Sequence, residues 1–299
     1  MLKVENVTKY YGDLKAVDNL SFEVEDGCIF GLLGLNGAGK TTTFRMIMGL
    51  IDDYTGSITL DGKKIDYSMT DKIGFLTEER SLLTKMTVVE QVKFYAILKN
   101  MKEEDIVKRL DYYLDKFGIS EYKYKKIKEL SKGNQQKIQF ITSIIHEPKI
   151  LILDEPFSGL DPINVELFKK EILELKEKGT SIIFSSHRME HVELFCEKLV
   201  VLVKGKTVLN GYLKDIKKEY KKKDVYIIGD VVKEDLEKIE GVVKVRKEND
   251  NYIVTISDEK YVSRLFNYVK KCDNIIRFSV EEPSLNEIFI EKVGNAYDK

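Results

Sequence analysis

Residues 29–48 read IFGLLGLNGAGKTTTFRMIM, and this stretch decides the fold. Its first five residues form an apolar run of the kind that makes a buried strand. The segment from Gly34 to Thr41 satisfies the spacing G-x-x-x-x-G-K-[ST] and leads into a helical segment. Glycines let backbone N–H groups approach a polyphosphate without a Cβ in the way, and a helix start adds positive potential. The stretch therefore predicts a phosphate-binding loop between a strand and a helix.

Two side chains of this loop are expected to carry chemistry. Lys40 would reach the β- and γ-phosphates of a nucleoside triphosphate, and Thr41 would ligate Mg²⁺. The other loop residues predicted to contact the nucleotide are Asn36, Gly37, Gly39 and Thr42. Glycine-rich turns between a strand and a helix also occur without ligands, but the Lys-Thr pair and both flanking segments favour a nucleotide site.

A second signal lies at residues 149–156, KILILDEP, where an apolar strand ends in two adjacent carboxylates. Burying two acids at a strand end is costly unless they meet cations. We expect Asp154 to hold Mg²⁺, directly or through water, and Glu155 to orient and deprotonate the attacking water. Two acids at a strand end are often only a surface corner. Together with the phosphate loop, they predict a site that hydrolyses a nucleotide.

Residues 130–137 read LSKGNQQK and lie between these two motifs. Here the chain resembles the nucleotide-binding subunits of ABC transporters, whose signature Leu-Ser-Gly-Gly-Gln opens a helix. The resemblance extends over about residues 1–212 and implies ATP as the nucleotide and ATP hydrolysis as the activity. Residues 77–80, 130–137 and 155–162 resemble one branch, the ATPase subunits of ABC-2-type exporters, which include sodium-efflux systems and carry a small C-terminal domain.

The resemblance also implies roles for five further residues. Tyr11 would stack on adenine, and His187, at the end of a predicted strand, would sense the γ-phosphate. Ser131 and Gly133 would contact the γ-phosphate of an ATP held by a second subunit. Asp161 lies in the loop that crosses the dimer interface in this family. Because the chain carries one copy of each motif, we expect it to close its site only as a homodimer or heterodimer.

Two departures from the family pattern bear on the site. Lys132 and Asn134 replace the usual glycine and glutamine of the signature, whereas Ser131 and Gly133 remain. Glu78 stands at the position of the glutamine loop of the family. A carboxylate binds hard cations more strongly than an amide does. Glu78 is therefore predicted to ligate Mg²⁺ or its water and to link the site to the membrane partner.

Glycine usage and periodicity divide the chain into two domains. Residues 1–212 alternate apolar strand-like runs with helical segments, which predicts an α/β domain with a mostly parallel sheet. The resemblance implies that this domain is a P-loop NTPase of ABC type. A helical insertion is expected at about residues 88–135, where strand signals disappear. Residues 213–223 are a basic run. Acidic residues interrupt it and no aromatic series accompanies it, so a linker is favoured over a phosphate or lipid patch.

The remaining residues, 224–299, carry signals for strands and helices in the order βαββαβ. This order predicts a small α+β domain of ferredoxin-like plan, with Asn249-Asp250-Asn251 as the hairpin turn. A final helix is expected to start at Ser284, because its spacing to Glu287 fits a capping box.

Composition narrows the possible partners and location. The chain has 49 Lys and Arg against 50 Asp and Glu, so its net charge of −1 gives no general attraction to nucleic acid, and no nucleic-acid partner is predicted. Apolar runs fall short of the ~18–20 residues that cross a bilayer. No targeting segment or cysteine framework is recognised. We expect a cytoplasmic protein that is peripheral on the cytoplasmic face of the cell membrane.

The resemblance implies a polytopic membrane permease as partner, powered through ATP-dependent dimer closure, with export as the expected direction. Two alternatives stay open. One is a soluble, non-transport ABC-type ATPase with a regulatory C-terminal module, although paired nucleotide domains and long coiled coils are both missing from this sequence. The other makes the C-terminal domain a ligand-sensing or RNA-binding core, although its strands carry no aromatic RNA-binding signature.

Overall fold

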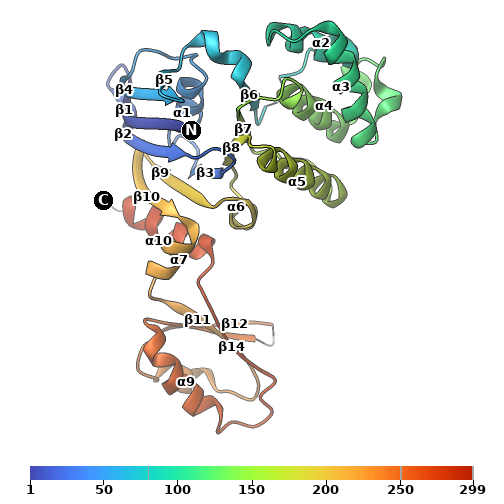
Figure 1. Cartoon of the computed structure of the whole chain (residues 1–299). Coiled ribbons are helices and arrows are strands. Elements are labelled where there is room, and N and C mark those ends of the chain that lie inside the picture. Colours follow the sequence, from blue (N-terminus) through green and yellow to red (C-terminus); the bar gives the residue numbers. More distant parts are fainter. Residues whose placement is uncertain (80, 250, 298–299) are drawn as a thin grey trace. The chain divides into compact units, whose positions relative to one another are not determined.

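The computed structural model describes residues 1–79, 81–249 and 251–297. The chain forms two compact units, unit 1 from Met1 to Asn210 and unit 2 from Gly211 to Lys299 (Figure 1). Among the described residues, no helix combines the length and the apolar character that crossing a bilayer requires.

Unit 1 is built on a six-stranded sheet with the order β10-β9-β3-β8-β7-β6. Its strands are β3 (Ile29–Gly34), β6 (Ile73–Leu76), β7 (Ile150–Asp154), β8 (Ser181–Ser185), β9 (Lys198–Val203) and β10 (Lys206–Tyr212). Strands β6 to β9 and β3 pair in parallel. Parallel strands are buried on both faces, which explains why these segments are nearly continuous apolar runs. The α/β class with a mostly parallel sheet is confirmed.

A second sheet of unit 1 is antiparallel, with the order β2-β1-β4-β5. Its strands are β1 (Leu2–Tyr11), β2 (Leu14–Val24), β4 (Thr55–Leu60) and β5 (Lys63–Lys64). The sequence pattern does not predict this sheet. Register shifts between Val4 and Val7 break the alternation of buried and exposed residues in β1.

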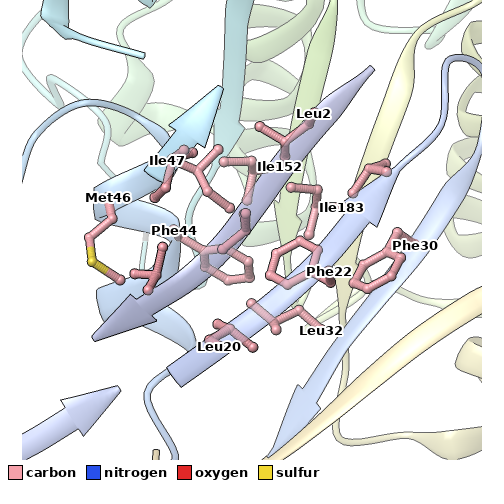
Figure 2. Packing of buried hydrophobic residues seen from close by; sticks show 14 of the residues in the cluster. Leu2, Leu20, Phe22, Phe30, Leu32, Phe44, Met46, Ile47, Ile152 and Ile183 are labelled. Carbon is pink, nitrogen blue, oxygen red and sulfur yellow. The ribbon is translucent and has the colours of Figure 1, made fainter. Parts of the chain in front are cut away.

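The two sheets of unit 1 share one hydrophobic core with helix α1 (Lys40–Ile47), as Figure 2 shows. Phe22 of β2 stacks on Phe30 of β3, with ring centroids 4.8 Å apart. Phe44 of α1 is fully buried in the same cluster. This packing holds the start of α1 against the end of β3, where the phosphate loop connects them.

The other helices of unit 1 include the expected insertion. They are η1 (Tyr67–Lys72), α2 (Val88–Leu98), α3 (Glu103–Lys116), η2 (Ser120–Tyr122), η3 (Ile127–Glu129), α4 (Lys132–Ile144), α5 (Pro162–Glu177) and α6 (Met189–Phe195). Helix α2 packs against α3 and α4 (Figure 1). It begins at a capping box in which Thr87 Oγ1 accepts from Glu90 N and the Glu90 carboxylate accepts from Thr87 N. The helical segment extends beyond the predicted end at 135, because α4 continues to Ile144.

Unit 2 contains a four-stranded antiparallel sheet with the order β12-β13-β11-β14. Its strands are β11 (Lys223–Ile228), β12 (Val242–Glu248), β13 (Asn251–Ile256) and β14 (Arg277–Glu281). Its helices are α7 (Leu213–Glu219), α8 (Lys233–Glu237), η4 (Glu259–Tyr261), α9 (Val262–Val269) and α10 (Leu285–Tyr297). Leu236 of α8 and Leu265 of α9 pack with Val225 of β11 in the core. The predicted α+β, ferredoxin-like plan is confirmed.

Three local predictions for this part of the chain had different outcomes. The capping box is confirmed, since Ser284 N donates to the Glu287 carboxylate at 3.1 Å and Glu287 N donates to Ser284 Oγ at 3.3 Å. The predicted linker at 213–223 instead contains α7 and the first residue of β11. Ile216 is buried in α7. The linker prediction relied on the charged residues of this segment and did not take the burial of Ile216 into account. The predicted hairpin turn includes Asp250, which lies outside the described residues.

A buried ion pair ties the insertion to α5. The Lys116 ammonium at the end of α3 contacts Glu171, which is only 1% exposed, and lies 2.6 Å from Glu174 Oε2. The side chains of Phe117, Phe140 and Phe168 pack beside one another and join α3, α4 and α5. Breaking a buried pair leaves an uncompensated charge, which is strongly destabilising.

We expect Lys116→Met to lower the free energy of unfolding by about 3 kcal/mol, because the Glu171 carboxylate would stay buried without its cation. Urea unfolding of the full chain measures the change. The control is Lys93→Met, which removes an exposed pair with Glu103 and should cost less than about 1 kcal/mol. Equal costs for the two variants would contradict the importance of the buried pair.

Candidate functional site

The phosphate loop connects the end of β3 to the first residue of α1. Gly39 precedes α1 with a φ of 104°, and a Cβ there would lie 2.6 Å from the Ala16 carbonyl oxygen. A glycine is therefore required where backbone N–H groups meet a ligand. The Lys40 ammonium curls over the loop and donates to the carbonyls of Gly34 at 2.7 Å and Leu35 at 3.2 Å. The carbonyl groups of the phosphate loop thus hold the Lys40 ammonium in place.

A cavity of about 560 Å³ lies over this loop. It is lined by Tyr11, Leu14, Lys15, Ala16, Asn36, Gly37, Ala38, Gly39, Lys40, Thr41, Thr42, Glu78, Asp154 and Lys204. The structure therefore brings together nine of the residues that the sequence singled out. The sequence analysis missed two lining lysines, Lys15 and Lys204, because no motif contains them.

Asp154 brings a carboxylate to the cavity from β7, which β8 separates from β3 in the sheet. It ends β7 and is only 8% exposed, and Ser185 Oγ donates a hydrogen bond to it. Burial raises the pKa of Asp154. The hydrogen bond from Ser185 and the Lys40 charge oppose this rise, while the charges of Glu78 and Glu155 add to it. A divalent cation would stabilise the ionised form of a carboxylate in such surroundings.

Mg²⁺ fits this group of side chains. Thr41, Glu78 and Asp154 all line the cavity and offer only oxygen atoms, the donors that Mg²⁺ prefers. Within the described ranges, no cluster of three His, Cys, Asp or Glu could hold a metal by itself. Mg²⁺ commonly binds to proteins through one or two carboxylates together with substrate phosphates. The residues present therefore suit a cation that arrives with the nucleotide.

Glu155 and His187 form a separate network at the ends of β7 and β8. The Glu155 carboxylate accepts a hydrogen bond from His187 N at 2.6 Å and lies 2.9 Å from His187 Nδ1. Ser186 Oγ donates to its second oxygen at 3.2 Å, and Glu155 N donates to the Ser185 carbonyl at 3.1 Å. The His187 side chain is 76% exposed. The sequence predicted the acid and the histidine but missed both serines.

Tyr11 lies at the end of β1 and is half exposed where it lines the cavity. The Lys9 ammonium lies 4.7 Å from the centroid of its ring. Lys9 is itself buried and pairs with Asp53 Oδ2 at 2.5 Å, so its position is fixed. The Lys9 ammonium therefore restrains the Tyr11 ring, as expected of a residue on which a base would stack.

Five predicted site residues are not among the described residues that line the cavity: Glu155 and His187 of the network above, and three others. Ser131 caps α4 by accepting a hydrogen bond from Asn134 N at 3.3 Å, and Gly133 lies in the first turn of that helix. Asp161 caps α5 by accepting from Asn164 N at 2.9 Å. Among the described residues, the wall of the nucleotide cavity includes none of the three.

Comparisons with known proteins identify the family. A family model described as "ABC transporter" matches residues 17–158, and one described as "ATP-binding protein DrrA1-3-like, C-terminal domain" matches residues 211–293. The ABC transporter ATP-binding protein YhaQ of Bacillus subtilis is 50% identical over 298 residues, covering 100% of both chains. The chain belongs to the ABC transporter ATP-binding proteins. This ABC protein is accordingly an ATP-binding ATPase.

Two further similarities each cover nearly three quarters of this ABC protein. The ABC transporter ATP-binding protein NatA of Bacillus subtilis is 33% identical over 219 residues, 72% of this chain and 89% of NatA. The structure of cbiO1 from Clostridium perfringens, part of the ABC transporter complex cbiONQ, has a TM-score of 0.64 and 32% identity. It covers 73% of this chain and 90% of cbiO1. The resemblance to ATPase subunits of the NatA type is thereby confirmed.

We expect Tyr11→Ala to weaken ATP binding roughly five- to a hundredfold, because base–aromatic stacking is worth about 1–3 kcal/mol. Binding of inorganic triphosphate should not change, since the phosphate loop is untouched. Isothermal titration calorimetry with both ligands measures the difference, and Tyr11→Phe serves as the matched control. Equal weakening for ATP and triphosphate would rule out a role of Tyr11 in base recognition.

Proposed function

We propose that this chain is the ATP-hydrolysing subunit that powers a separate membrane permease in an exporter. The observation that carries the proposal is the single cavity lined by Tyr11, the phosphate loop, Glu78 and Asp154. Family membership supports the ATPase activity, and cbiO1 is part of a transporter complex. The sequences of residues 77–80, 130–137 and 155–162 and the similarity to NatA support the exporter branch.

Hydrolysis is assigned to residues of unit 1. Lys40 and the loop N–H groups bind the triphosphate. Thr41, Glu78 and Asp154 would hold Mg²⁺, which would supply neutralisation of the phosphate charge. Glu155 accepts a proton from the attacking water, and its contacts with Ser186 and His187 orient the carboxylate for this role. His187 is exposed beside Glu155 and senses the γ-phosphate.

Two nucleotide-binding subunits close around ATP in this proposal. Ser131 and Gly133 at the start of α4, and Asp161 at the start of α5, lie outside the cavity wall among the described residues. A second subunit would bring the positive end of its α4 to the γ-phosphate. The first turn of α4 contains no acidic residue that would oppose such a contact. The partner is a second copy of this chain or a related ATP-binding subunit.

The permease docks in a second cavity of unit 1, which we call the docking groove. It has a volume of about 490 Å³ and is lined by residues of η1, β6, α2 and α4. Leu50 and Leu98 are more than half exposed in its wall, and Phe75 adds a third apolar side chain. An apolar helix end of a membrane protein suits this wall. The chain would then be peripheral on the cytoplasmic face of the membrane.

We expect Glu155→Gln to bind ATP but hydrolyse it about 10²–10⁴-fold more slowly, because the water loses its general base. The variant should accumulate as a closed dimer. Phosphate release and gel filtration with and without ATP and Mg²⁺ measure both effects. Glu166→Gln changes an exposed acid on α5 that pairs with Lys169; it is the control and should hydrolyse ATP normally. Failure of Glu155→Gln to dimerise with ATP would contradict the two-subunit site.

A further inference from the structure

Gln139 on α4 is a buried glutamine whose amide points at the loop that carries Glu78. The side chain is only 6% exposed. Its Nε2 lies 3.1 Å from the Thr77 carbonyl oxygen, 2.9 Å from Thr77 Oγ1 and 3.3 Å from the Glu79 carbonyl oxygen. The amide therefore binds the backbone on both sides of Glu78.

The loop is closed on itself at the same point. Thr77 Oγ1 donates to the Glu79 carbonyl and lies 3.1 Å from Ser81 Oγ. Within the described part of the chain, Gln139 Oε1 is buried without a hydrogen-bond partner. The donor end of the amide is thus fully engaged by the loop while its acceptor end is left unsatisfied. These hydrogen bonds indicate that Gln139 holds the backbone of residues 77–79 in place.

The loop forms part of two different cavities. Thr77 and Gln139 line the docking groove, whereas Glu78, the residue between the bonded carbonyls, lines the nucleotide cavity. The loop therefore contributes to both cavities, and the Gln139 side chain of α4 is hydrogen-bonded to it. A shift of the loop by even 1 Å would move the Glu78 carboxylate relative to a bound Mg²⁺ ion.

We propose that Gln139 is a positioning residue that holds Glu78 in place for Mg²⁺. The inference rests on the proposed function, in which Glu78 ligates Mg²⁺ or its water. The neutral amide fits this role, since it donates to carbonyl oxygens without adding a charge near the metal. We assign Gln139 no role at the phosphate loop, because the side-chain hydrogen bonds described for it all go to Thr77 and Glu79.

The test is a Mg²⁺ titration of ATP hydrolysis by the full chain. Gln139→Leu keeps the size of the side chain and removes both donor hydrogens. We expect the Mg²⁺ concentration for half-maximal activity to rise about three- to thirtyfold, given what buried hydrogen bonds contribute. ATP binding in the presence of EDTA should be unchanged. Gln139→Met, which also removes the donors without adding a charge, should act in the same direction if the leucine variant folds poorly.

Two further variants make the result decisive. Glu78→Gln should itself raise the Mg²⁺ requirement, and adding Gln139→Leu to it should have no further effect, because Gln139 acts through Glu78. Thr180→Val is the structural control: it removes a buried hydrogen bond to the Pro148 carbonyl and should leave the Mg²⁺ requirement unchanged.

Two outcomes would overturn the inference, and they are distinguishable. If Glu78→Gln shifts the Mg²⁺ requirement but Gln139→Leu and Gln139→Met do not, the positioning role of Gln139 is wrong and the proposed function stands. If Glu78→Gln itself shifts nothing, the metal-binding role of Glu78 is wrong, and the role of Gln139 is lost with it.

Discussion

The parallel pairing of β3, β8 and β7 is the constraint on which the site depends. Parallel strands end at the same edge of a sheet, so the segments that follow them meet there. Gly34, Asp154 and Ser185 are the last residues of these three strands. The pairing of Asp154 with Ser185 sets a buried acid beside a hydroxyl donor. The Lys40 charge acts on this acid because both residues lie at this edge of the sheet and line the same cavity.

Much of the fold could be predicted because it is encoded locally. The phosphate loop, the acids after β7 and the capping box at Ser284 are short spacings whose chemistry does not depend on distant residues. The order of elements in unit 2 followed from hydrophobic periodicity alone. The parallel strands were recognised for the same reason, since burial on both faces leaves a continuous apolar run.

Other features could not be predicted, since contacts between distant segments decide them. The first antiparallel sheet escapes notice because its register slips near Asn6, and α7 depends on the burial of Ile216. The serines around Glu155 and the amide of Gln139 act on residues at least 30 positions away. Ser131, Gly133 and Asp161 raise a different difficulty. The motifs assign these three residues to a site that two subunits share. Within a single chain, the described residues that line the nucleotide cavity do not include them.

The sheet of unit 2 ends in two outer strands, β12 and β14, each of which pairs with one neighbouring strand among the described residues. Both carry charged side chains: Lys244 and Lys247 are exposed on β12, and Arg277 is exposed on β14. Charges on an outer strand oppose the addition of a strand from another molecule. In the proposed cycle two such molecules meet and part with every round of hydrolysis. The exposed charges oppose edge-to-edge pairing of the two C-terminal sheets whenever the molecules associate, so the association stays reversible.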